Sequence, residues 1–381
     1  MESVYRMEMR IQKPAFNIST NFLANGENPA RLSISTDFGA VGRPLPPAWL
    51  QQRYESSMKI KFLSSWGSKF LPKYTKVGDV EFTRDPNCRD YDWLVVYDEM
   101  PRSDKKYDVY CPREHTILIT QEPAIIKVQP PCYTHQFRYM LTTLSPAICR
   151  HPGYRRGAGS LIGMTGHPFE KLLTEPERPK NKLISAVCAR KLMTHTDHSK
   201  RHALFEYLLA NLPGFVWKGK NISPLKHKYE ALDDFKYHIA VENTVSDYHW
   251  TEKVSDSIMS LCLTFYSGDP KLEQVLPPDC FIRIPIDDPP RALAIIQEAI
   301  DNNEYEKRLP AIRAARRLLL ERYNIYSQIL SVIAEHEQKY GESPRPAEPW
   351  KLCERHYLRR NPLNLIAEGW YMLRVHSLRK K

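Results

Sequence analysis

The sequence predicts an α/β protein with two Rossmann-like domains that face each other across a cleft and with helices toward the C-terminal end. Short, continuous apolar runs bounded by charged or turn residues recur in both halves, as buried parallel strands require. A helical pattern at 199–212 follows one of these runs. A basic stretch rich in Gly and Pro, 151–180, separates the two halves and marks the domain boundary.

Length and composition agree with this organisation. A chain of 381 residues should form about two domains, and 42% hydrophobic with 26% charged residues is typical of a globular protein with a large core. No secretory signal or apolar run of about 20 residues is visible. Eight cysteines show neither CxxC nor zinc-finger spacing, so we interpret them as reduced packing residues of a cytoplasmic protein.

The first half contains an extension and one domain. Residues 1–57 have weak periodicity with several Asn, Gly and Pro, and we predict an N-terminal extension of unknown role. The N-terminal Rossmann-like domain spans 58–165. Its predicted strands are 58–63, 93–97, 116–120 and 137–141.

The second Rossmann-like domain spans 166–345. It opens with the apolar run 183–188, continues through the helix 199–212 and ends in a strongly helical region, 290–340. Residues 346–381 form a basic, aromatic C-terminal tail.

The formal net charge of +11 favours polyanionic partners. Basic and aromatic residues alternate in the tail, as suits the interface of an anionic membrane. An equally favoured interpretation is a solvated tail partly docked on the body. A nucleic-acid-binding protein would also explain the charge, but it predicts a basic face with exposed aromatics in place of a cleft, so we predict no nucleic-acid partner. The tail residues are Trp350, Arg355, Tyr357, Arg359, Arg360, Trp370, Tyr371, Leu373, Arg374, Arg379, Lys380 and Lys381.

Residues 237–285 carry the most functional information. A predicted strand, 238–241, delivers Glu242 and Asn243 at its carboxyl end, and a helix begins near Thr251. Free N–H groups at a helix start can meet an anion, and either Thr251 or Asp247 would cap this helix. A lysine in the first turn, Lys253, is unfavourable against the helix dipole unless an anion lies nearby. This arrangement is typical of a nucleotide-sugar site.

The order of residue types here resembles the donor-binding motif of the family-ten glycosyltransferases, the α1,3/4-fucosyltransferases. That motif is Phe-Glu-Asn-(Ser/Thr), a short loop, Tyr-x-Thr-Glu-Lys, an apolar helix, a strand ending in Gly-x-Pro, then Pro-x-(Asp/Ser)-(Ala/Ser/Cys)-Phe-Ile. The resemblance is specific over 182–283, thin over 58–143, and absent from 1–57 and the tail. It implies the GT-B arrangement of two Rossmann-like domains, in which 58–165 would bind the acceptor and 166–345 would bind the nucleotide sugar. It also implies a bacterial-type member, since animal members begin with a membrane anchor.

The resemblance also assigns roles to residues. Glu122, at the end of a predicted strand, matches the general base, although a strand-end Glu is by itself more often a surface or cap residue. Arg201 and Lys253 would meet the donor diphosphate, with Lys200 as a competing register for Arg201. Glu252 would accept hydrogen bonds from ribose or sugar hydroxyls. Two further residues, Glu242 and Asn243, would shape the strand-end pocket.

Two places depart from the family motif, and the milder departure is 264–270, which replaces a segment that is usually Pro-rich at its start. His249 stands where the family usually has Tyr, with Tyr248 beside it, so contacts to the sugar or base of the donor would differ. This departure bears on whether the donor sugar is fucose.

The function implied is inverting transfer of a sugar, fucose from GDP-fucose, to a hydroxyl of lipopolysaccharide or another surface glycan. The partners would be a GDP-sugar donor, a glycan or lipid-linked glycan acceptor and an anionic membrane surface, with no metal or other cofactor. The protein would be cytoplasmic and peripheral on the inner face of the membrane. Two alternatives stay open, namely a different nucleotide sugar in lipopolysaccharide core assembly and a non-catalytic glycan-binding relative.

Two patterns suggest metal sites that we do not predict. Asp90-Tyr91-Asp92 is a DxD string, but it directly precedes a buried run and is interpreted as a turn leading into a strand. A histidine-rich group has a spacing that fits no strong zinc pattern. Its members are His195, Asp197, His198 and His202.

Overall fold

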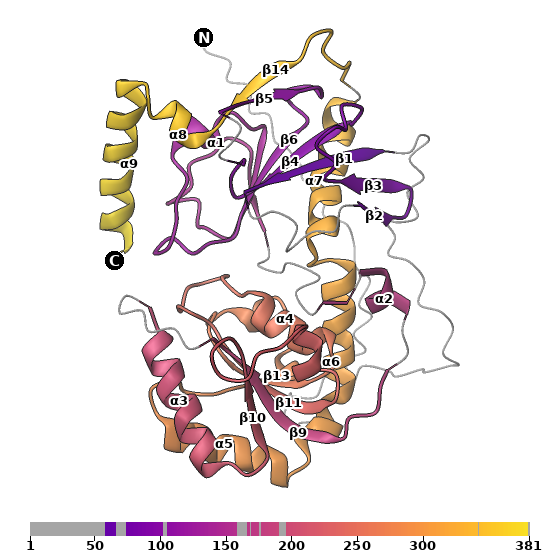
Figure 1. The fold of residues 1–381 in the computed structure, drawn as a ribbon, viewed down its shortest axis with the longest axis vertical. Helices are drawn as coiled ribbons and strands as arrows, with labels where there is room; N and C mark the ends of the chain where they lie inside the picture. The colour runs from indigo at the N-terminus through magenta and orange to yellow at the C-terminus, as the bar shows by residue number, and fades with distance from the viewer. Residues whose placement is uncertain are drawn as a thin grey trace, which may run out of the picture. The chain divides into compact units, whose positions relative to one another are not determined.

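The computed structural model describes residues 58–65, 74–101, 105–157, 166–167, 169–174, 177–189, 196–341 and 343–379. The predicted extension, 1–57, lies outside the described residues. All described residues belong to one compact unit, Pro46–Lys381. Two largely parallel sheets and a set of C-terminal helices confirm the predicted α/β class (Figure 1).

The first sheet has seven strands in the order β2-β3-β1-β4-β6-β7-β8. Neighbouring strands are parallel except the pair β2–β3, which forms an antiparallel hairpin at one edge. The four predicted strands are confirmed, because the apolar runs form the buried centre of the sheet. The bounds are β1 (Lys59–Ser64), β2 (Tyr74–Val77), β3 (Val80–Thr83), β4 (Trp93–Tyr97), β6 (Thr116–Thr120), β7 (Tyr139–Thr142) and β8 (Tyr154–Arg156).

The second sheet has five strands, all parallel, in the order β10-β9-β11-β12-β13. Helix α3 (His198–Asn211) connects β9 to β10, and α4 (Glu252–Met259) connects β11 to β12. Because β10 and β11 lie on opposite sides of β9, the chain order reverses between β9 and β11, where such sheets bind ligands. The bounds are β9 (Lys182–Val187), β10 (Phe215–Lys218), β11 (Phe235–Val241), β12 (Leu263–Ser267) and β13 (Phe281–Arg283).

Three long helices follow the second sheet: α5 (Pro289–Asp301), α6 (Glu304–Glu321) and α7 (Ile325–Tyr340). Asn324 turns the chain between α6 and α7, since its amide donates to the Leu320 carbonyl at 2.6 Å and its carbonyl oxygen accepts from Ser327 N at 2.7 Å. Helix α7 then packs on the first sheet, where His336 Nδ1 lies 2.9 Å from Tyr139 Oη. The predicted second domain, 166–345, thus ends in a helix that belongs by its contacts to the first sheet.

The predicted tail, 346–381, is largely folded onto the first half. Strand β14 (Trp350–Cys353) pairs antiparallel with β5 (Lys106–Val109), and α8 (Arg355–Leu358) and α9 (Pro362–Arg379) follow. Leu352 and Val375 are fully buried in the same core cluster as Leu94 and Leu118. The docked alternative therefore describes this segment better than a free tail.

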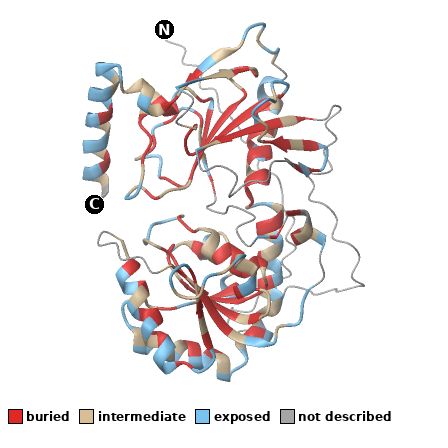
Figure 2. Ribbon diagram, in the orientation of Figure 1, coloured by how far each residue is buried: buried red, intermediate tan, exposed pale blue. Residues whose placement is uncertain are grey.

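The outer face of α9 is nevertheless open to solvent, as the pale blue residues in Figure 2 show. Two short helices, α1 (Pro131–Thr134) and α2 (Phe169–Thr174), complete the described α-helices. Within the described part of the chain, every helix is too short or too polar to traverse a bilayer.

Candidate functional site

The carboxyl edge of the second sheet joins the start of α3 to the end of β11. Arg201, in the first turn of α3, donates from Nη1 to Asn243 Oδ1 at 2.6 Å and to the Val241 carbonyl at 3.2 Å. The backbone N–H of Asp197, the N-cap residue of α3, donates to the Asn243 carbonyl at 2.9 Å. These bonds place Arg201 and Asn243 together at the point where the strand order reverses.

Arg201 is the buried cation of its segment. It is 6% exposed, whereas the side chain of the neighbouring Lys200 is 54% exposed and pairs with Asp197. Among the described residues, no hydrogen-bond acceptor reaches Arg201 Nε. A buried guanidinium with a spare donor at a switch point is suited to bind an anion.

Glu242 organises the start of α4. Its carboxylate, only 3% exposed as a residue, accepts from Thr251 N at 2.8 Å and from Thr251 Oγ1 at 2.7 Å. Lys253 Nζ donates to Glu242 Oε2 at 3.1 Å and to Thr251 Oγ1 at 2.8 Å. Thr251 is the N-cap of α4, while Asp247 instead forms an ion pair with Lys271.

Lys253 keeps its charge in this setting. Burial alone would lower the pKa of Lys253, but the carboxylates of Glu242 and Glu252 outweigh burial and raise it. Burial opposes ionisation of Glu252, yet Lys253 and Lys228 bring the pKa of Glu252 down to about 2. The site thus presents an ammonium and a carboxylate that both remain ionised at neutral pH.

A second ion pair supports the first turn of α4 from below. Asp256 is fully buried, and its Oδ2 lies 2.8 Å from Lys228 Nζ, which also donates to the Glu252 carbonyl at 3.1 Å. Burial raises the pKa of Asp256 to about 6, against the opposing influence of Lys228. Sequence reasoning missed this pair because its members are far apart in the chain.

The loop between β11 and α4 places two aromatic side chains differently. His249 is buried and its Nδ1 has no partner among the described residues, while burial lowers the pKa of its imidazole. Tyr248 has a positive φ of 59°, held by its N–H donating to Asp269 Oδ1 at 2.8 Å. Its ring packs against the Arg156 guanidinium, 4.1 Å from the ring centroid. His249 therefore lies inside the loop and Tyr248 outside it.

Glu122 lies two residues after the end of β6 on the first sheet and is half-buried. Burial raises the pKa of Glu122, and the charges of Asp98 and Glu252 raise it further, while Lys253 opposes them. Two residues of the second half, Glu252 and Lys253, therefore act on the Glu122 carboxyl through their charges. A carboxyl group with a raised pKa is suited to accept a proton near neutral pH.

The structure also shows an acidic pair that sequence reasoning missed. Asp98 and Glu99 follow β4 at the edge of the sheet where Glu122 lies, and both are buried. Lys127 Nζ lies 2.7 Å from Asp98 Oδ2 and 2.9 Å from Glu99 Oε1. Two acidic residues immediately after an apolar strand were the sequence signal that could have predicted acidic side chains at the carboxyl edge of the first sheet.

The two unfavoured metal patterns have other partners. Asp92 accepts from Lys59 N at 2.8 Å and from Arg345 Nη2 at 2.7 Å, and Asp90 also pairs with Arg345, so this string is a turn leading into β4. His195 lies outside the described residues. Within the residues that the structure describes, no three His, Cys, Asp or Glu side chains are grouped as a metal site would require.

The predicted site residues thus form one connected group in the second half, with Glu122 linked to it by charge. The group is Arg201, Glu242, Asn243, His249, Glu252 and Lys253. A cavity of about 590 Å³ in the first half is lined by none of these residues.

No family model and no curated protein sequence matches the chain. The fold is similar to a crystal structure of an alpha1,3-fucosyltransferase with GDP-fucose and to one with GDP. Each has 16% identity and a TM-score of 0.43, and the match covers 74% of this chain and 98% of that chain. Sucrose-phosphate synthase (tll1590) from Thermosynechococcus elongatus has 8% identity and a TM-score of 0.41, covering 74% of this chain and 88% of that one. At these values the likeness by itself assigns no activity.

Proposed function

We propose that this chain is an inverting glycosyltransferase that moves a sugar, most simply fucose from GDP-fucose, to a hydroxyl of a glycan acceptor. The observation that carries the proposal is the convergence of Arg201 and Lys253 at the switch point of the second sheet. Each lies in the first turn of a helix, α3 or α4, whose N-terminal end favours an anion. The diphosphate of a nucleotide sugar fits this pair of cations.

In the proposed donor site, Arg201 contributes its spare Nε–H and Lys253 its ammonium to the diphosphate oxygens. Asn243 holds the Arg201 guanidinium, and Glu242 holds the Lys253 ammonium, so both cations are oriented before the donor binds. Because two fixed cations offset the charge of the leaving group, the proposal needs no metal ion.

In the proposed reaction, Glu122 accepts the proton of the acceptor hydroxyl as its oxygen attacks the anomeric carbon. The bond from that carbon to the diphosphate oxygen breaks on the opposite side, which inverts the configuration and releases GDP. Attack in this geometry needs the acceptor between the two halves, so the cleft predicted from the sequence is part of the proposal.

The test is a screen of nucleotide sugars with the full chain and a set of oligosaccharide acceptors. Release of GDP from GDP-fucose, dependent on acceptor, is expected. Release of UDP or CMP instead would establish the alternative in which His249 accompanies another donor and the product belongs to a lipopolysaccharide core. Acceptor binding without any nucleotide release would show a non-catalytic glycan-binding relative.

The proposal includes a lipid-linked acceptor and a cytoplasmic location at the inner face of the membrane. Leu363, Ile366, Trp370 and Leu373 line the outer face of α9 at helical spacing and are 58–74% exposed. Exposed apolar side chains beside basic residues suit insertion at an anionic headgroup layer. All eight cysteines are free, which suits a reducing compartment.

A further inference from the structure

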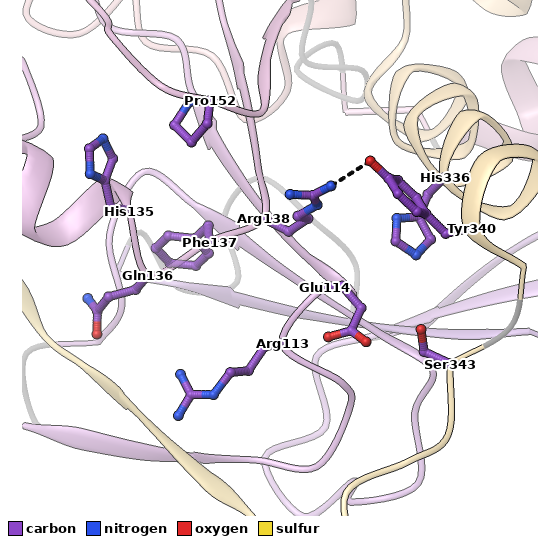
Figure 3. A pocket seen from close by; sticks show the side chains of 10 residues that line it. All are labelled: Arg113, Glu114, His135, Gln136, Phe137, Arg138, Pro152, His336, Tyr340 and Ser343. Atoms are coloured by element: carbon purple, nitrogen blue, oxygen red, sulfur yellow. Dashed lines mark hydrogen bonds between the residues drawn. The ribbon is translucent and has the colours of Figure 1, made fainter.

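A cavity of about 590 Å³ lies at the amino edge of the first sheet (Figure 3). Arg113 and Glu114 precede β6, Arg138 precedes β7, and Pro152 precedes β8. Since these strands are parallel, their amino ends lie at the edge opposite to Glu122, which follows β6. The cavity is therefore separate from the proposed donor site.

Aromatic rings, and no carboxylates, hold the two arginines of this cavity. The Arg113 guanidinium lies 4.3 Å from the Trp350 ring centroid. Arg138 donates to Tyr340 Oη at 2.8 Å and packs over the Tyr340 ring at 5.2 Å. Within the described residues, neither arginine has an acidic side chain at salt-bridge distance. Both guanidinium groups are exposed toward solvent with donors available for an oxyanion.

A buried imidazole also lines the cavity. His336 is 2% exposed, and its Nδ1 is engaged by Tyr139 Oη, but its Nε2 has no hydrogen-bond partner among the described residues. Burial, His115 and Arg138 lower the pKa of His336, with Glu114 opposing, so the ring is neutral. A neutral, buried nitrogen without a partner marks a position where a ligand hydroxyl would satisfy it.

The charge balance of this region is positive. Glu114 is the one acid among the described residues that line the cavity, and its backbone N–H and Ser343 lower the pKa of its carboxyl. An adjoining cavity of about 540 Å³ shares Arg138, Pro152 and Tyr340 and adds Lys339. It also adds Arg155 and Glu335, which neutralise each other at 2.8 Å.

We propose that this cavity is a second binding site, for a sugar that carries a phosphate or carboxylate group. Arg113 and Arg138 bind the oxyanion, and His336 Nε2 bonds a hydroxyl of the sugar. A volume of this size holds a monosaccharide with its charged group and exceeds what a bare phosphate ion needs. The inference does not depend on the proposed transferase activity.

The test is isothermal titration of the full chain with glucose 6-phosphate, glucuronate, inorganic phosphate and glucose, with saturating GDP present. Saturable binding of the two acidic sugars, weaker binding of phosphate and none of glucose are expected. Arg113→Gln and Arg138→Gln should each weaken binding by at least about tenfold, the scale of a charge-assisted hydrogen bond. Because both arginines are exposed, the melting temperatures of the two variants should stay near that of the parent chain.

Arg322→Gln is the matched control, because Arg322 also lies over a tyrosine ring, at 5.5 Å from Tyr323, away from this cavity. The imidazole resonances of His336, assigned by their absence in His336→Gln, should shift with glucose 6-phosphate. No binding of any acidic sugar at about 10 mM, or equal losses in all three arginine variants, would overturn the proposal. Binding that is seen only when GDP is left out would assign the ligand to the donor site and would also overturn the proposal.

Discussion

Arg201 and Asn243 are joined by a 2.6 Å hydrogen bond between the first turn of α3 and the loop after β11. The bond thereby joins the segments that follow β9 and β11, two neighbouring parallel strands, at the point where the strand order reverses. The bond also uses one Nη of Arg201 and leaves Nε available. Asn243 is thus a positioning residue for the guanidinium.

Glu122→Gln should leave GDP binding unchanged and lower transfer by roughly 100-fold or more, the scale of losing a general base. The parent chain should lose kcat/KM as the pH falls through the raised pKa of Glu122, above the ordinary glutamate value. The variant should lack this acidic limb. Initial rates across pH measure both effects, with Glu298→Gln, an exposed carboxylate on α5, as control. Near-parent turnover of Glu122→Gln would remove it from the mechanism.

Arg201→Ala and Lys253→Ala should each weaken GDP binding by about 1.5–3 kcal/mol, as expected for charge-assisted hydrogen bonds. Lys200→Ala is the control, because Lys200 is exposed and pairs with Asp197. Calorimetry with GDP measures all three variants. Unchanged affinity in both Arg201→Ala and Lys253→Ala would place the donor elsewhere.

Asp256 should make stability depend on pH. Its folded pKa of about 6 exceeds the ordinary aspartate value of 3.8, so the folded state binds the proton more tightly. Protonated Asp256 therefore contributes to the free energy of unfolding, on the order of 3 kcal/mol in total. This stabilisation is fully present below about pH 4 and is lost as the pH rises through about 6. Urea unfolding from pH 4 to 6 measures this effect. The free energy of unfolding should decline less steeply with pH in Asp256→Asn than in the parent. Asp279→Asn, at an exposed aspartate, is the control, and identical slopes in all three chains would contradict the assignment.

Changes at exposed positions of α9 and at a buried position of β14 should have different effects. Trp370→Ser with Leu373→Ser should reduce binding to anionic vesicles by more than about tenfold, since each membrane-buried CH₂ contributes about 0.8 kcal/mol. Its melting temperature should not change, because both side chains are exposed. Leu352→Ala, at a fully buried position of β14, should instead lower the free energy of unfolding by about 2–5 kcal/mol.

Leu209→Ser, at an exposed leucine on α3, is the control for vesicle co-sedimentation. Parent-like vesicle binding by the Trp370 and Leu373 double variant would exclude the outer face of α9 as a membrane contact. Because β14 is part of the first half, removal of 350–381 is expected to destabilise the chain, so it cannot isolate the membrane contribution.

The buried central strands were predictable because a run such as Trp93–Tyr97 is apolar at every position. Strands β5 and β14 were not, since each has four residues of mixed polarity and its partner lies in a distant part of the chain. The motif placed Thr251 and Lys253 at a helix start, as the structure shows. Their bonds to Glu242 could not be predicted, because spacing in sequence does not determine the contacts across a loop.

The choice between Arg201 and Lys200 illustrates the same limit. Adjacent helical positions differ by about 100° around the axis, so an uncertainty of one residue in the start of α3 exchanges the inward and outward cation. The structure resolves this with Arg201 inward. In contrast, the tail composition predicted exposed aromatic and basic residues but not Glu368, which binds Arg355 at 2.8 Å and Arg359 at 2.7 Å and fastens α9 to α8.

The pairing of β5 with β14 constrains the order in which the chain matures on the ribosome. The second sheet has all its strands once Phe281–Arg283 has emerged, so it can close while synthesis continues. The first half, although made earlier, must wait for α7, β14 and the helix that carries Val375 before its core is complete. The half synthesised first is therefore the half finished last, and the backbone groups of β5 that pair with β14 stay unpaired until β14 has been made.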